Sequence, residues 1–152
     1  MTIDVKQRIA NNLSGISDRL ARELESIKNI EQDVAYVNEK LAVLAVLAKD
    51  MHYIDISTYY YDSLISERNT FFSKSRSYAA ILYNPHKEEL RLGIVIVGKD
   101  FLGSERAEYA LNSWFLKYHR QLYLKAYDKI HVLISNFTEF MLNRIKQKEL
   151  YE

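Results

Sequence analysis

The sequence predicts a mostly helical α+β protein in which a long N-terminal helix and a helical C-terminal region flank one antiparallel β-hairpin. Apolar residues recur along the first third of the chain with the spacing of a heptad repeat. Glycine and proline, which interrupt helices, number only 4 and 1 among 152 residues. Two runs of strand-forming residues flank an Asn-Pro pair that favours a turn. The length suits a single domain over residues 1–152.

The N-terminal region, residues 9–51, is predicted to form a coiled-coil-like helix. Its apolar residues follow one another in steps of four and three for about six heptads, although Glu23 interrupts the series. Gly15 costs about 1 kcal/mol in a helix interior, and a neighbouring serine would cap a new helix, so the alternative is a break near residues 14–17. The apolar series consists of Ile9, Leu13, Ile16, Leu20, Ile27, Ile30, Val34, Val37, Leu41, Leu44, Ala48 and Met51.

The apolar face of this helix needs a partner, and two arrangements satisfy it. The face packs against the C-terminal helices of the same chain, or it meets other copies of the chain, and both can hold along different parts of the helix. Leu at position a with Ile at position d disfavours parallel dimers and favours trimers or tetramers. The stretch LAVLAVLA at 41–48 is apolar on nearly every side, so we expect it to enter the globular part while the N-terminal end projects or pairs. We assign to an oligomer seam Ile16, Leu20, Ile27, Ile30, Val34 and Val37.

The β-hairpin is predicted at residues 78–98. Two runs rich in aliphatic and aromatic residues flank the sequence NPHKE, and Pro85 suits the second position of a turn. We expect the hairpin to pack on the helices through alternate residues between Leu90 and Ile96.

The segments on either side of the hairpin are assigned from weaker patterns. Within residues 52–77, the sequence YIDIST fits a strand or a helix, and DSLISERNTFF fits a short helix with Phe71 and Phe72 inward. Residues 104–150 have helical periodicity throughout. They predict either two helices joined near 126–129 or one long bent helix, because neither Gly nor Pro marks the joint.

The stretch GIVIVGKD at 93–100 nearly matches the phosphate-binding pattern G-x-x-x-x-G-K-[ST]. The four residues between its glycines are Ile and Val, which form strands rather than a phosphate cradle, and Asp100 replaces the required Ser or Thr. A nucleotide hydrolase is therefore not predicted. We expect a helix to begin near Ser104, where Lys99 and Arg106 would hold an anion at the helix N-terminus; the simpler interpretation is a serine-capped helix.

No spacing in the sequence points to catalysis, so we expect a protein that is not an enzyme and that holds no metal or cofactor. The chain has no cysteine, and none of its 4 histidines forms an i, i+4 pair. Its 21 basic and 20 acidic residues give a net charge of +1, which argues against a strongly basic nucleic-acid binder. No apolar run resembles a signal peptide or a bilayer-spanning segment, so a cytoplasmic protein without membrane contact is expected.

The 12 tyrosines are the remaining functional signal. Three are consecutive, so no regular element buries all of them on one face, and basic residues follow them. We expect a non-catalytic oligomeric interaction protein, an adaptor, inhibitor or structural subunit, that binds a protein partner. The alternative is a binder of a nucleotide-like anion or of nucleic acid. The expected ligand or partner surface consists of Tyr59, Tyr60, Tyr61, Arg68, Arg76, Lys99 and Arg106.

Overall fold

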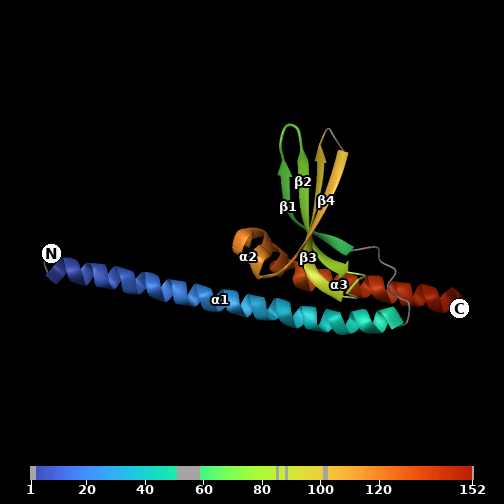
Figure 1. Ribbon diagram of the computed structural model, residues 1–152, viewed down its shortest axis with the longest axis horizontal. Helices are drawn as coiled ribbons and strands as arrows, with labels where there is room; N and C mark the ends of the chain where they lie inside the picture. Colours follow the sequence, from blue (N-terminus) through green and yellow to red (C-terminus); the bar gives the residue numbers. More distant parts are fainter. Residues whose placement is uncertain (1–2, 51–58, 85, 88, 101–102, 152) are drawn as a thin grey trace. The chain divides into compact units, whose positions relative to one another are not determined.

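The computed structural model describes residues 3–50, 59–84, 86–87, 89–100 and 103–151, and it is a mixed α+β structure (Figure 1). The chain divides into two compact units, Met1–Asp33 and Val34–Glu152, which we describe separately. The elements in chain order are α1 (Ile3–Asp50), β1 (Tyr59–Asn69), β2 (Lys74–Asn84), β3 (Glu89–Asp100), β4 (Gly103–Ala110), α2 (Ser113–Tyr118) and α3 (Arg120–Tyr151).

The four strands form one antiparallel sheet in the order β1-β2-β3-β4. The two strands of the hairpin predicted at 78–98 lie in β2 and β3, but the prediction of a single hairpin was wrong, because β1 and β4 extend the sheet on both sides. The DSLISERN sequence lies in β1 and not in a helix. Two register shifts in β1, between Tyr61 and Ser63 and between Leu64 and Ser66, break the two-residue alternation that identifies a strand.

The strand β4 also replaces a predicted helix. Its sequence, GSERAEYA, contains Glu, Arg and Ala, which favour helices in isolation. The exposed backbone edge of the Ile- and Val-rich strand β3 offers a continuous ladder to this segment, and pairing with it overrides the local preference. Because Ser104 and Arg106 lie in β4, the predicted helix N-terminus and its anion site do not exist there.

The sheet has two unlike faces, which the pairing register assigns. Tyr60, Ile81 and Leu92 pair across three strands and define the helix-covered face. Tyr60 lies on α3, with its ring centroid 5.4 Å from that of Phe137 and 5.0 Å from that of Phe140. Every second row of paired residues points to the opposite face, where Ala80 and Val95 are nonetheless fully buried.

The helices α2 and α3 are separated at His119, not near residues 126–129 as one of the two predictions had it. Asn112 caps α2, because its side-chain oxygen accepts a hydrogen bond of 2.9 Å from the N–H of Phe115. The other prediction, one long helix over 104–150, holds only from Arg120 onward, as α3. Its buried residues recur at helical spacing and form the core with the sheet: Tyr123, Ala126, Leu133, Phe137 and Met141.

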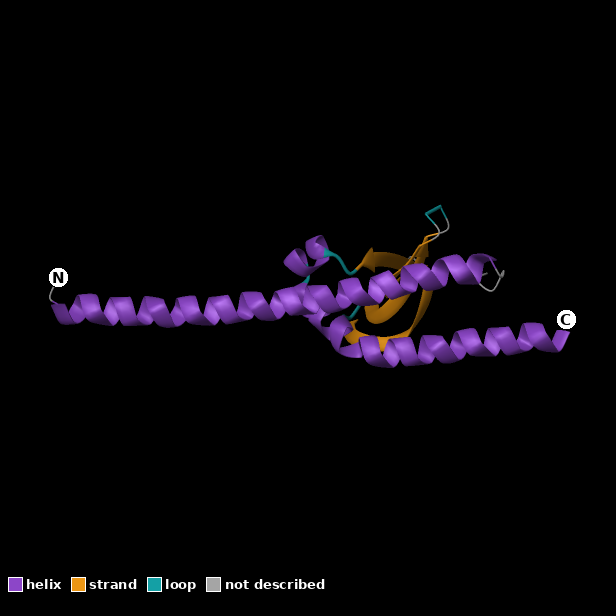
Figure 2. Cartoon of the chain, turned by 90° about the horizontal axis from the view of Figure 1, so that it is seen from below, coloured by secondary structure: helices purple, strands orange, loops and turns teal. Residues whose placement is uncertain are grey.

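The helix α1 is continuous through Gly15, so the alternative of a break near residues 14–17 was wrong. In its second half, Val34, Leu41 and Ala45 lie on one side and are at most 5% exposed. This half and α3 both run along the same end of the sheet (Figure 2). The remainder of the LAVLAVLA stretch is less buried than predicted, because the side chains of residues 43, 46 and 47 are more than half exposed.

Candidate interaction surfaces

The three consecutive tyrosines do not form one surface. Tyr60 packs on α3, and its hydroxyl donates a hydrogen bond of 2.9 Å to Asp62. Burial, together with this bond to a carboxylate, raises the pKa of Tyr60 to about 12. Tyr61 lies on the opposite face of the sheet, with its ring 4.8 Å from that of Tyr78. Tyr59 begins β1 opposite Leu82, and its side chain is outside the described residues.

The cations of the predicted cluster are divided between the two faces of the sheet. Arg76 of β2 and Arg106 of β4 pair with the same residue of β3, so their side chains lie on one face of the sheet. Lys99 pairs with Lys74 two residues further along, so both lysines lie on that face too. Arg68 points to the helix-covered face, since it pairs with Ser75 in the intervening row. The structure therefore brings Arg76, Arg106 and Lys99 together but separates them from Arg68 and Tyr60.

The carboxylate of Glu67 contacts this basic group. An oxygen of Glu67 lies 3.2 Å from the Nε of Arg76 and 3.7 Å from the Nζ of Lys74. The hydrogen bond from Arg76, with its positive charge, lowers the pKa of Glu67. These exposed ion pairs contribute little stability, so we interpret them as organising a solvated surface rather than a buried site.

A cleft of about 540 Å³ lies between the helix-covered face and the α2–α3 region. It offers two cationic side chains, Arg68 and Lys125, and the hydroxyl groups of three serines, beside the aromatic rings of Tyr109 and Phe115. Of the predicted surface residues whose side chains the structure describes, only Arg68 lines this cleft. The described lining residues are Ser66, Glu67, Arg68, Ser75, Ser77, Ile96, Tyr109, Phe115, His119, Gln121, Leu122 and Lys125.

The turn between β1 and β2 presents two phenylalanines to solvent. Phe71 is 90% exposed and Phe72 is 62% exposed, so the prediction that both point inward was wrong. Their rings meet edge to face at 4.7 Å. Thr70 and Ser73 brace the turn: the Thr70 N–H donates to the Ser73 carbonyl at 2.8 Å, and the Ser73 N–H donates to Oγ1 of Thr70 at 3.0 Å. In Figure 1 this turn lies at the end of the sheet away from the helices.

The first unit of the chain presents an apolar stripe along α1. Six large aliphatic side chains follow one another at spacings of three and four residues, and each is between 41% and 61% exposed. We define the apolar stripe as Val5, Ile9, Leu13, Ile16, Leu20 and Leu24.

The six residues of the predicted seam occupy three environments. Ile16 and Leu20 belong to the exposed apolar stripe. Ile27, Ile30 and Val37 are half-buried, and Val34 is buried at 3% exposure. The heptad pattern is the same throughout, so the sequence alone did not separate these environments.

The part of the chain that the structure describes contains few groups of side chains suited to metal binding or catalysis. Among those residues, no group of three or more His, Asp or Glu side chains is placed to hold a metal ion. None of the described helices combines the length and the apolarity that a membrane crossing requires.

Comparisons with protein-family models, with curated proteins and with solved structures find no match to this chain. The exposed surfaces described above are therefore the candidate functional sites of the chain.

Proposed function

We propose that the protein is a non-catalytic oligomeric interaction protein, an adaptor, inhibitor or structural subunit, that self-associates through the apolar stripe of α1. The observation that carries the proposal is the exposure of all six aliphatic side chains of the stripe. Covering a half-exposed Leu or Ile contributes on the order of 1 kcal/mol, so the stripe offers several kcal/mol per chain to an association. Helices also depend on packing for most of their stability in water.

The distal end of the sheet, away from the helices, is the proposed partner surface. It combines the phenylalanine pair of the β1–β2 turn with the basic group formed by Lys74, Arg76, Lys99 and Arg106. Aromatic side chains and arginine are enriched in protein interfaces. This surface replaces the tyrosine-rich surface of the sequence prediction, because Tyr60 is packed against α3.

Self-association is tested by replacing Ile16 and Leu20 together with aspartate. Light scattering at tens of micromolar should find an oligomer for the unmodified protein and a monomer for the variant, while circular dichroism keeps most of the helix and strand signal. Ser14→Asp with Ala21→Asp adds the same charge outside the stripe and should leave the oligomer intact. An unmodified protein that is monomeric at this concentration would falsify the proposal.

The second candidate function is binding of a small anionic ligand in the cleft, and Arg68 with Lys125 favours it. Calorimetric titration with AMP tests this function, since AMP carries both a phosphate and an aromatic base. Arg68→Ala should abolish the binding heat, whereas Arg76→Ala, which removes a cation from the other face of the sheet, should leave it unchanged. If AMP produces no binding heat with the unmodified protein, AMP-like ligands do not bind in this cleft.

A further inference from the structure

We infer that the apolar stripe of α1 pairs with the same stripe of a second copy in antiparallel orientation, with Lys6 of each chain against Glu23 of the other. This inference rests on the proposed self-association and specifies its geometry. The exposed residues of the stripe are arranged symmetrically about one point of the helix. Val5 and Leu24, Ile9 and Leu20, and Leu13 and Ile16 are each equally distant from the point between Ser14 and Gly15. Reversing the helix about that point therefore superposes the set on itself.

A symmetric set of this kind suits a two-fold interface. In a two-fold dimer, residue i contacts residue j of the partner, and residue j contacts residue i in return. In an antiparallel coiled coil, each core layer joins a position a of one helix to a position d of the other. In the heptad frame of α1, Leu13 and Leu20 are a residues, and Ile9 and Ile16 are d residues. Reversal about the point between Ser14 and Gly15 therefore joins every a residue to a d residue.

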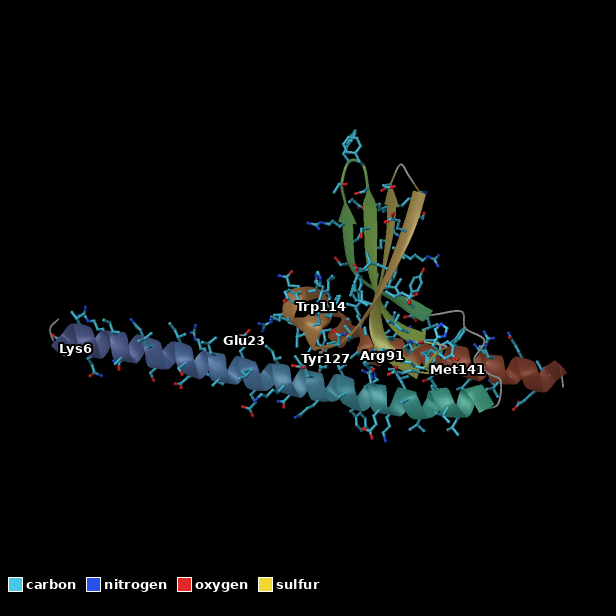
Figure 3. All side chains as sticks on the ribbon, viewed as in Figure 1. Lys6, Glu23, Arg91, Trp114, Tyr127 and Met141 are labelled. Atoms are coloured by element: carbon cyan, nitrogen blue, oxygen red, sulfur yellow. The ribbon has the colours of Figure 1, made fainter. Side chains whose placement is uncertain are left out.

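The charged residues of the same frame select this register. Lys6 continues the a series, Glu23 continues the d series, and the two are also equally distant from the point between Ser14 and Gly15. The register thus forms four aliphatic layers with a Lys–Glu layer at each end. Figure 3 shows both side chains on α1. Val5 and Leu24 of the partner border each charged layer, which reduces its contact with water.

In the competing arrangements, Lys6 of one chain does not meet Glu23 of the other. A parallel dimer brings Lys6 against Lys6 and Glu23 against Glu23, so both layers hold like charges. An antiparallel dimer shifted by one heptad no longer places Glu23 opposite Lys6, and one of the two possible shifts places Glu23 opposite Leu13. Charged or polar residues in a coiled-coil core specify register and orientation more than they add stability. Of the flanking e and g positions between residues 5 and 24, only Arg19 is charged, so the Lys–Glu layers decide the pairing.

Cysteine crosslinking in the full-length chain tests the orientation, since the protein has no cysteine of its own. In the proposed dimer, a cysteine at position 9 meets one at position 20 of the partner. Two copies of position 9 lie about 16 Å apart along the axis, at about 1.5 Å per residue, which is beyond the reach of a disulfide. Oxidation of Ile9→Cys or Leu20→Cys alone should give little crosslinked dimer, and oxidation of the mixture should give a mixed dimer. Efficient crosslinking of each variant alone indicates parallel helices and overturns the inference.

Charge exchange tests the register independently. Lys6→Glu and Glu23→Lys should each weaken the dimer about tenfold or more, because each puts like charges into two layers. The double variant K6E/E23K should recover most of the lost affinity. The two positions lie about 25 Å apart on one helix, so recovery requires contact between chains. An oligomer without recovery overturns the inference and leaves the proposed self-association standing, whereas a monomeric unmodified protein ends both.

Discussion

Asn38 in α1 accepts a hydrogen bond of 2.7 Å from the backbone N–H of Leu92 in β3. The strand β4 pairs with β3 from Gly93 onward, and its last contact is the bond from the N–H of Leu111 to the carbonyl of Leu92. The N–H of Leu92 points to the same edge, where β4 has already ended. The side chain of Asn38 thus gives the N–H of Leu92 an acceptor and connects α1 to the sheet.

Replacing Asn38 with alanine should lower the free energy of unfolding by about 1–3 kcal/mol, because it leaves the N–H of Leu92 buried without an acceptor. Urea denaturation of the unmodified protein and the variant measures this difference. Asn29→Ala is the matched control, since Asn29 lies on the same helix and is exposed. Equal losses for the two substitutions would show that the bond to Leu92 contributes nothing specific.

The elements predicted correctly are those whose signal is local. The heptad series identified α1, and the two strand-forming runs on either side of Pro85 identified the pairing of β2 with β3. The strands β1 and β4 were missed because bulges in β1 disturb its alternation, and because β4 becomes a strand only through its pairing with β3. Such pairing depends on the neighbouring strand, which the periodicity of a single segment does not report.

The candidate surfaces were harder to predict than the fold. The same heptad spacing places Leu20 in solvent and Val34 in the core, because exposure depends on where the rest of the chain packs. The tyrosine cluster failed for a related reason: consecutive residues of a strand point to opposite faces, so Tyr60 and Tyr61 have different neighbours. The turn that carries Phe71 and Phe72 had a signal that the helical interpretation overlooked, namely Asn69, Thr70 and Ser73, residue types common in turns.

Replacing Phe71 and Phe72 together with serine should change the free energy of unfolding by less than about 0.5 kcal/mol per site, because both rings are largely exposed. The inward orientation predicted from the sequence instead implies a loss of about 3 kcal/mol or more for each ring. Chemical denaturation separates the two expectations. Phe137→Ser serves as the buried comparison, since that ring is 2% exposed and its removal should be strongly destabilising.

Tyr60 should make stability depend on pH in alkaline solution. Its pKa is raised from the ordinary value of 10.0 to about 12 in the folded protein, so folding favours the protonated phenol. This contribution is fully present below pH 10 and is lost as the pH rises from 10 to 12. Tyr60→Phe should therefore show a shallower loss of stability over that interval than the unmodified protein.

Absorbance titration near the tyrosinate band provides the direct measurement. The unmodified protein should have a late ionisation that Tyr60→Phe lacks. Tyr36→Phe is the control, because that ring is 61% exposed. Identical alkaline titrations of the unmodified protein and Tyr60→Phe would contradict the assignment.

The two glycines of the GIVIVGKD sequence should respond in opposite ways to alanine. Gly93 lies in the sheet where a Cβ atom would come within 2.4 Å of Cδ1 of Leu82 and 2.7 Å of the Tyr109 carbonyl oxygen. The backbone oxygen belongs to the paired strand β4 and has little freedom to move, so Gly93→Ala should cost about 1–3 kcal/mol of stability. At Gly98 nothing lies within 4 Å of the added atom, and Gly98→Ala should be neutral or slightly stabilising. Urea denaturation of the two variants tests this contrast; a larger loss at Gly98 than at Gly93 would overturn the packing explanation.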